Sequence, residues 1–370
     1  MLGIFILVAG LRFETGYDWL AYEIVTNNAP SIVGLFTVDA LAPQVKSMEP
    51  LFVLLVAVVK TMGGNVQLLY LVTVTFNAYV LYRFLKYTRA KIAVCLAIYA
   101  CWLFLAMQMG VIRQSVAVSF FLLSIIAFDK GKMLKQFVFL IAALLMHYSS
   151  IMFLPLFFTR IWQKIIAARL PILFGFALFY VSGLGLYKPI MLLLQSLPSS
   201  FLAGKLAMYT ELGPAEISFL SRIYFFMNLM ICLYLAKSYD KSSRIDTVLL
   251  SASFMLVMCQ SLFSEFPLIW NRVQYLAVTA QSVLLFRNFS RDDNYALMKF
   301  GMAATLSMAV LVKDLTNPAF LPYLPYQWYP YYLYTGEPGD GRARTVRFYD
   351  KYIKSVFENK SESLDTSTTH

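Results

Sequence analysis

Apolar residues occur in blocks long enough to cross a lipid bilayer, and short polar runs separate these blocks. A hydrocarbon core of about 30 Å needs roughly 20 residues of helix. The sequence therefore predicts an all-α, polytopic integral membrane protein. The expected membrane spans are residues 66–84, 92–110, 112–128, 170–187, 219–236, 247–264, 269–286 and 295–312.

Three apolar stretches do not fit a simple count of spans. The stretch after Glu49-Pro50 ends near Met62, before two glycines, and its length is typical of a re-entrant or interfacial segment. Residues 134–158 form either one long span or two half-helices that meet near 146–150, and the basic residues that follow favour half-helices. The opening "MLGIFILVAGL" is too short to span, so we expect a partial helix or a start placed too far downstream. With re-entrant and half helices included, about 10–11 membrane segments are expected.

Composition and charge support this class. Hydrophobic residues make up 59% of the chain and charged residues only 14%, whereas soluble domains carry about 25% charged residues. The net charge of +11 is spread over short runs between apolar blocks, which favours cytoplasmic loops over a nucleic-acid surface. The runs expected in the cytoplasm are 83–91, 129–135, 237–244 and 287–293. The four cysteines lie in apolar segments without a disulfide or metal spacing.

This topology predicts one polytopic domain over residues 1–341. Its outer side receives loops 12–49 and 188–218 and a tyrosine-rich segment at 317–341. The first loop has two basic and five acidic residues, a net charge of −3, as expected for the outer side. Residues 342–370 form a charged tail that we expect to be solvated and disordered.

Arg113 is the only charged residue among the 37 residues from 92 to 128. One interpretation is an arginine that snorkels to lipid headgroups. The other is half of a phosphate site, because Gln114 follows it at the start of a helix, where backbone N–H groups favour an anion. Arg12, Arg222 and Arg272 are expected near the same outer face. A planar guanidinium can hold two oxygens of a phosphate at once, so the set predicts an anionic ligand.

Acidic residues and a histidine supply candidates for a general base. Asp18 follows Arg12 across a glycine that suits a turn. Glu49 precedes a proline at a helix start, where a simple helix cap or a partner of the helix dipole is the alternative. His147 either bonds a backbone carbonyl within an apolar segment or, if the helix breaks there, points into a polar cavity.

The segment 317–341 holds six tyrosines, one tryptophan and five prolines. It is either an interfacial aromatic belt or a lip that binds sugar rings. The candidate sugar-binding residues are Tyr22, Tyr326, Trp328 and Tyr329.

Four blocks in order, "LRFETGYDWLAY", "MEPLF", "GVIRQSVAVSF" and "LLMHYSSIMFLPL", resemble the EpsG-like family of Wzy-type polysaccharide polymerases. The resemblance covers about 12–160. It implies a glycosyltransferase of the all-helical GT-C class in the bacterial cytoplasmic (inner) membrane, with its active site facing the periplasm or cell exterior. Such an enzyme transfers a growing glycan from undecaprenyl pyrophosphate onto the non-reducing end of a lipid-linked repeat unit, without a metal or other cofactor.

The resemblance also assigns roles and partners. Arg12, Arg113 and Arg272 would bind pyrophosphate, and His147, Asp18 or Glu49 would be the base. We favour His147, because its ordinary pKa near 6.5 suits proton transfer. The implied partners are the lipid-linked oligosaccharide, the growing glycan and the bilayer, together with a chain-length regulator and a flippase, and no nucleic acid. A transporter or flippase for the same lipids, an O-antigen ligase and a membrane acetyltransferase are the alternatives.

Overall fold

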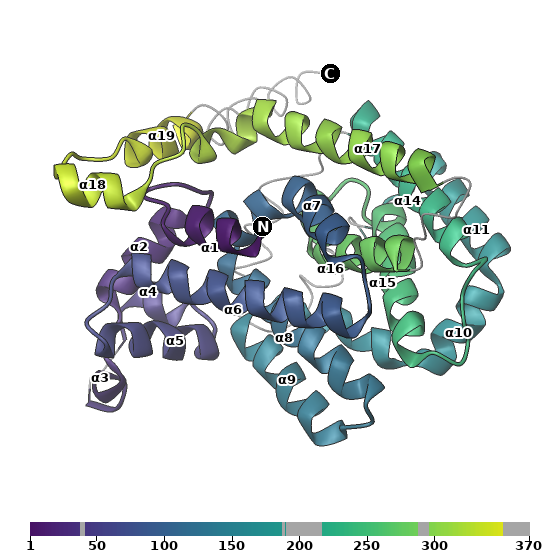
Figure 1. Ribbon diagram of the computed structural model, residues 1–370, viewed down its shortest axis with the longest axis horizontal. Helices are drawn as coiled ribbons and strands as arrows, with labels where there is room; N and C mark the ends of the chain where they lie inside the picture. The colour runs from purple at the N-terminus through teal and green to yellow at the C-terminus, as the bar shows by residue number, and fades with distance from the viewer. Residues whose placement is uncertain (38–40, 187–188, 190–216, 288–295, 351–370) are drawn as a thin grey trace, which may run out of the picture. The chain divides into compact units, whose positions relative to one another are not determined.

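The computed structural model describes residues 1–37, 41–186, 189, 217–287 and 296–350 (Figure 1). These residues form helices and connecting loops without a β-strand, so the prediction of an all-helical chain is confirmed. The predicted loop 188–218 lies almost wholly outside the described residues, as do positions 288–293 and 351–370.

The chain divides into two compact units, which are described separately. The first unit comprises residues 1–157 and 282–345, and the second comprises 158–281 and the end of the chain from 346. The first unit contains α1 (Leu2–Gly10), α2 (Trp19–Asn28), α3 (Ile32–Thr37), α4 (Pro43–Lys46), α5 (Pro50–Thr61), α6 (Val66–Tyr87), α7 (Ile92–Trp102), η1 (Leu105–Gly110), α8 (Ile112–Asp129), α9 (Met133–Met146), η2 (Tyr148–Phe157), α17 (Ala296–Thr316), η3 (Pro318–Tyr323), α18 (Tyr329–Thr335) and most of α19 (Gly341–Phe348).

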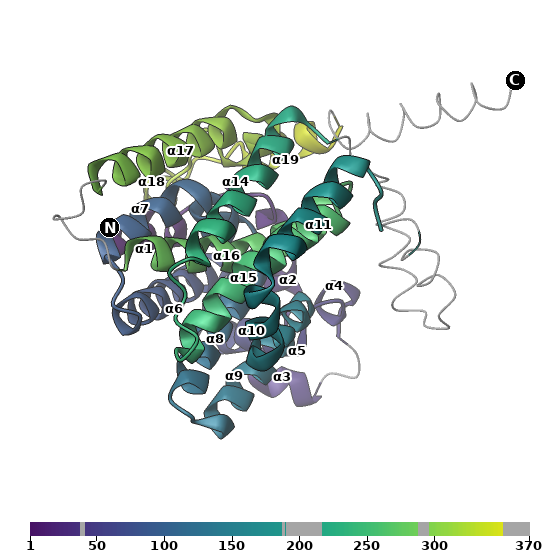
Figure 2. The same cartoon turned by 90° about the vertical axis from the view of Figure 1, so that its right-hand side faces the viewer.

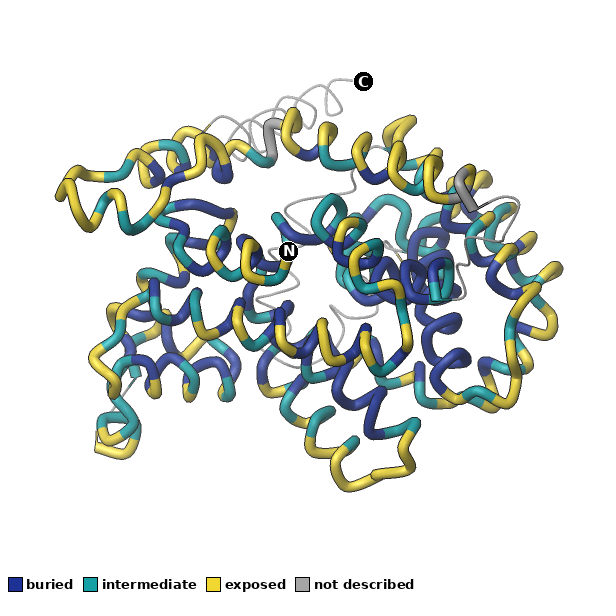
Figure 3. Tube along the Cα trace, viewed as in Figure 1, coloured by how far each residue is buried: buried dark blue, intermediate teal, exposed yellow. Residues whose placement is uncertain are grey.

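Helix α8 packs against both α6 and α9 in the first unit (Figure 1). Asn65 starts α6 because its side chain accepts hydrogen bonds from the N–H groups of Gln67 and Leu68. Most side chains of α8 are buried, whereas α9 exposes much of one apolar face (Figure 3). Such an apolar exposed face is expected where a helix meets lipid.

The second unit is built from α10 (Thr159–Ala167), α11 (Arg169–Ser182), α14 (Phe219–Leu235), α15 (Arg244–Leu262) and most of α16 (Pro267–Phe286). Helix α15 packs against α10, α11 and α14 (Figure 2) and is buried along most of its length. Asn228, Gln260 and Gln281 form a chain of amide hydrogen bonds in this unit, which satisfies polar groups among apolar helices.

Three helices among the described residues are long and apolar enough to cross a membrane: α6, α8 and α15. A fourth span results if the bent pair η2 and α10 is counted as one. The expected span 92–110 is divided, because α7 ends at Trp102 and the π-helical turn η1 follows. The total of 10–11 membrane segments and the likeness to the GT-C class stay predictions.

The chain breaks where the half-helix interpretation expects it to break. Helix α9 ends at Met146, His147 has extended backbone angles, and the 3₁₀-helix η2 follows. Pro155 lies within η2 and lacks the N–H that a regular helix would use. Whether these segments re-enter the membrane stays a prediction.

The two ends of the first unit are joined by backbone pairing. Phe13 donates to the carbonyl of Gln327 at 2.8 Å, and Tyr329 donates to the carbonyl of Leu11 at 2.8 Å. Residues 342–348, which we expected in a solvated tail, lie in helix α19. The carboxylate of Glu14 accepts hydrogen bonds from the N–H groups at the start of this helix.

Candidate active site

Glu49, Arg113 and His147 come from three different segments of the first unit and meet through their side chains. One carboxylate oxygen of Glu49 lies 2.5 Å from Nη1 of Arg113. The other lies 2.8 Å from Nδ1 of His147. Glu49 therefore holds the guanidinium and the imidazole at once, and we call these three residues the polar cluster.

Local structure explains why Glu49 can bridge the other two residues. Pro50 starts α5, and the Glu49 backbone is extended just before it. The Glu49 side chain does not cap this helix; it turns toward Arg113 and His147 instead. Glu49 thus stands at the N-cap position without a capping hydrogen bond from its side chain, and the alternative of a dipole partner stays open. The alternative for His147 was a hydrogen bond from its ring to a backbone carbonyl. Its Nδ1 instead bonds the carboxylate of Glu49.

The carboxyl group of Glu49 is 2% exposed. Burial by itself disfavours its charge, but the hydrogen bond with His147 and the positive charge of Arg113 lower its pKa to about 2. A carboxylate that holds its proton this weakly is a poor base at neutral pH. It is instead suited to orient the imidazole and the guanidinium.

Arg113 keeps part of its donor capacity in the cluster. Its side chain is 23% exposed, and its Nε is buried without a hydrogen-bond partner. The guanidinium also lies 5.9 Å from the ring centre of Phe52. An ion pair with a buried carboxylate distinguishes Arg113 from an arginine that merely snorkels to the lipid surface.

Tyr22 and Asp18 lie next to the cluster. Tyr22 is buried, lies beside Arg113 and packs against Phe52 with ring centres 5.7 Å apart. Its hydroxyl donates a 3.4 Å hydrogen bond to Asp18. Burial and the nearby carboxylate of Asp18 raise the pKa of this hydroxyl, so Tyr22 acts as a hydrogen-bond donor.

Arg12 lies in the same unit but is fully buried. Its Nη1 donates to the carbonyls of Ala9 and Gln108, at 2.7 and 2.8 Å, and its guanidinium stacks 3.7 Å over the ring of Tyr70. Its backbone forms a bridge with Trp328. Arg12 thus ties α1, η1 and the aromatic segment together, and its predicted contact with pyrophosphate stays a prediction.

Gly16 makes this close approach to η1 possible. Its φ is 118°, a conformation that side chains rarely adopt, and a Cβ here would overlap the carbonyl oxygen of Met109. The chain between Arg12 and Asp18 is bent and not helical, as the sequence predicts.

The remaining predicted site residues are distributed over both units. Gln114 is buried in α8. Arg222 in α14 and Arg272 in α16 belong to the second unit, so their predicted role beside Arg113 stays a prediction.

The predicted sugar-binding residues of the aromatic segment are partly exposed in the first unit. Trp328 is 50% exposed and Tyr326 is 36% exposed. The Tyr326 hydroxyl donates to the carbonyl of Val8, and the Tyr329 hydroxyl accepts from Asn65 at 3.5 Å. Sugar binding by these residues stays a prediction.

The sequence interpretation missed a buried polar network behind the cluster. Asn77 of α6 donates to the side chains of Gln108 and Ser115 and accepts from Ser119. The signal was an asparagine in the middle of an expected span, where polar residues are costly unless they are paired.

Among the described residues, no three or more His, Cys, Asp or Glu side chains lie together in a way that could hold a metal ion.

The sequence profile described as the EpsG family matches residues 1–331. No curated protein and no solved structure matches the chain.

Proposed function

Because the chain belongs to the EpsG family, we propose that it is a bacterial polysaccharide polymerase that elongates glycans on undecaprenyl pyrophosphate. The family and the apolar helices identify a membrane protein. The proposal places it in the cytoplasmic membrane, with the polar cluster facing the periplasm or the cell exterior. The loop 12–49, whose net charge is −3, supports this orientation.

One observation carries the proposal: Glu49 bridges a guanidinium and an imidazole at the break between α9 and η2. Glycosyl transfer needs a base for the acceptor hydroxyl and positive charge for the departing pyrophosphate. The polar cluster contains both kinds of group, since His147 can act as the base and Arg113 carries the positive charge, and Glu49 contacts both.

The proposed step is a direct displacement. The hydroxyl at the non-reducing end of the lipid-linked repeat unit attacks the anomeric carbon of the growing glycan and gives its proton to His147. The bond between that carbon and the pyrophosphate oxygen breaks, and the pyrophosphate leaves with the bonding electrons. Arg113 stabilises the charge that develops on it.

Glu49 acts in this scheme as a positioning residue. Its contact with Nδ1 fixes the orientation of the imidazole, so that the other ring nitrogen takes the proton. Its contact with Nη1 fixes the plane of the Arg113 guanidinium, whose partly exposed side would meet a phosphate oxygen.

The test is reconstitution of the full chain with purified lipid-linked repeat units. We expect ladders of elongated glycan that persist in EDTA, because the proposed mechanism uses no metal. A flippase would move the lipid across the membrane without extending its glycan. Lipid movement without ladders would therefore refute this proposal and favour a flippase. Ladders that EDTA stops would disprove the metal-free mechanism.

Variants in the polar cluster assign the roles. Arg113→Lys should abolish polymer while the protein still accumulates, because an ammonium cannot pair with Glu49 and bind a phosphate in the same fixed plane. His147→Asn retains a donor toward Glu49 and should lower kcat about 10²–10⁴-fold. Arg83→Lys, at an exposed position of α6, is the control and should leave activity unchanged. Wild-type polymer from the Arg113 variant would refute the role of its guanidinium.

A further inference from the structure

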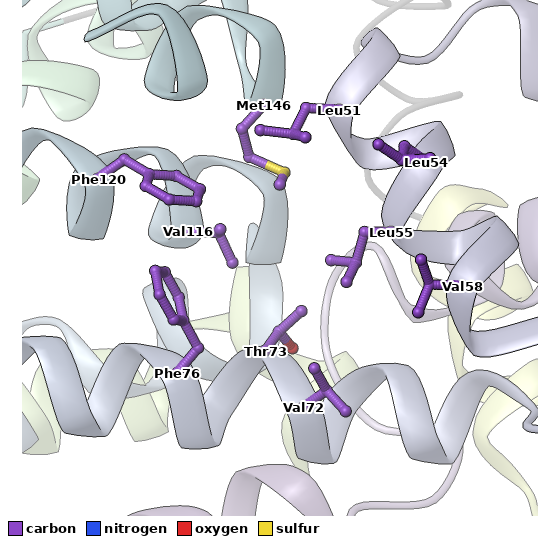
Figure 4. A pocket seen from close by; sticks show the side chains of 10 residues that line it. All are labelled: Leu51, Leu54, Leu55, Val58, Val72, Thr73, Phe76, Val116, Phe120 and Met146. Carbon is purple, nitrogen blue, oxygen red and sulfur yellow. The ribbon is translucent and has the colours of Figure 1, made fainter. Parts of the chain in front are cut away.

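An apolar cavity of about 290 Å³ lies between α5, α6, α8 and α9 of the first unit. Figure 4 shows its side chains converging on one hollow from these four helices. The lining residues are Leu51, Leu54, Leu55, Val58, Val72, Thr73, Phe76, Val116, Phe120 and Met146. The single hydroxyl among them, on Thr73, donates to backbone carbonyls of its own helix. The cavity therefore offers a ligand hydrocarbon contacts and nothing else.

Three residues of the cavity wall are close neighbours in the chain of the three residues of the polar cluster. Leu51 follows Glu49 by two residues, Met146 directly precedes His147, and Val116 lies one helical turn after Arg113. Each of the three charged or titratable groups thus has a chain neighbour in the cavity wall. A molecule with an anionic end and a hydrocarbon chain could place its anionic end at the polar cluster and its chain in the apolar cavity.

The opposite side of the cavity is open. Leu54 is 44% exposed, Val58 36% and Val72 37%. If α5 re-enters the membrane as the sequence predicts, these exposed aliphatic side chains face hydrocarbon rather than water. The cavity is therefore a groove that leads from the polar cluster to lipid.

The reaction explains why such a groove is needed. In the proposed function, the leaving pyrophosphate carries a prenyl chain, and that chain must have an apolar path while the phosphate is held at Arg113. Exposing the chain to the polar cluster would be unfavourable. This groove supplies an apolar hollow whose wall contains chain neighbours of Glu49, Arg113 and His147.

We propose that the groove between α5, α6, α8 and α9 binds the phosphate-proximal prenyl units of the lipid-linked substrate. The inference rests on the proposed function for the identity of the chain. The rings of Phe76 and Phe120, with centres 5.1 Å apart, pack against the methyl branches of this chain.

The test uses a photoreactive prenyl diphosphate that carries a diazirine on its first isoprene units and no sugar. With the full chain in lipid nanodiscs, we expect labelled peptides from α5 and from the first half of α8. Undecaprenyl phosphate should compete with the probe, whereas phosphatidylglycerol should not.

Two variants fill the groove from its rim. Leu54→Trp and Val58→Trp change half-exposed side chains, so the fold should tolerate them. Each methylene that they displace should weaken probe binding about fourfold. They should also raise KM for the lipid-linked donor. The matched control is Ile141→Trp, an exposed aliphatic position of α9 outside the groove, which should leave labelling unchanged.

The outcomes separate the groove from the reaction. Equal competition by phosphatidylglycerol would mean that bilayer lipid fills the groove, and the proposal would be overturned. Labelling elsewhere, or labelling insensitive to Leu54→Trp, would also overturn it even if polymer is made. Groove labelling in a protein that makes no polymer would support prenyl binding and refute the proposed function alone.

Discussion

At the scale of single residues, the ionisation of Glu49 should make the stability of the protein depend on pH. Its folded pKa of about 2 lies below the ordinary value of 4.5. A lowered pKa means that the charged form is favoured by folding, so its stabilisation is fully present above about pH 4.5. This stabilisation is lost as the pH falls through the folded pKa.

Comparing the wild type with Glu49→Gln isolates this contribution, because all other carboxyl groups are shared. The wild type should unfold at a higher temperature than the variant above about pH 5, and the difference should shrink toward pH 2. Thermal unfolding in detergent across this range measures it. A difference that stays constant or grows on acidification would contradict the ion-pair arrangement.

At the scale of elements, Asn77 joins α6, η1 and α8 through one amide. It is 2% exposed, and its bonds satisfy side chains of Gln108, Ser115 and Ser119. We expect Asn77→Leu to leave buried polar groups without partners, at a cost of about 1–3 kcal/mol. The variant should unfold at a lower temperature and, because η1 leads directly into Arg113, should also lower polymerisation.

Asn27→Leu is the control for this substitution, because Asn27 is exposed in α2. Its unfolding temperature should stay close to that of the wild type. If Asn77→Leu is equally harmless, the network does not hold the three elements together.

At the scale of the whole first unit, its N-terminal and C-terminal segments are joined by a buried hydrogen bond and by an exposed ion pair. These two interactions should contribute unequally to stability. The buried indole N–H of Trp19 donates to the hydroxyl of Thr345 at 2.8 Å. Arg342 pairs with Glu23 at 2.9 Å, and its side chain is 64% exposed. Exposed ion pairs contribute little to stability, whereas an unsatisfied buried donor is costly.

Thr345→Val should therefore release α19, and Arg342→Ala should not. Limited proteolysis is the measurement, with faster cleavage near residues 341–348 expected only in the Thr345 variant. Equal cleavage of both variants would show that the exposed pair is as important as the buried bond.

Much of the helical architecture follows from the periodicity of apolar residues. The expected spans 66–84, 112–128 and 219–236 correspond closely to α6, α8 and α14. The span 92–110 was predicted as continuous because its residues are uniformly apolar, but the chain changes from α-helix to π-helix near Leu105. Hydropathy is insensitive to such a change, since it depends on how apolar the residues are and not on the number of residues per helical turn.

The sequence by itself determined that the chain is helical and apolar, and it identified Glu49, Arg113 and His147 as residues of interest, because charges in apolar surroundings are costly and therefore conspicuous. Only the tertiary structure decided how they act together. Glu49 and Arg113 are 64 positions apart, and Glu49 and His147 are 98 apart, so no local spacing could reveal that one carboxylate holds both. Burial likewise separated Arg12, whose side chain is fully enclosed, from Arg113, whose side chain is partly exposed.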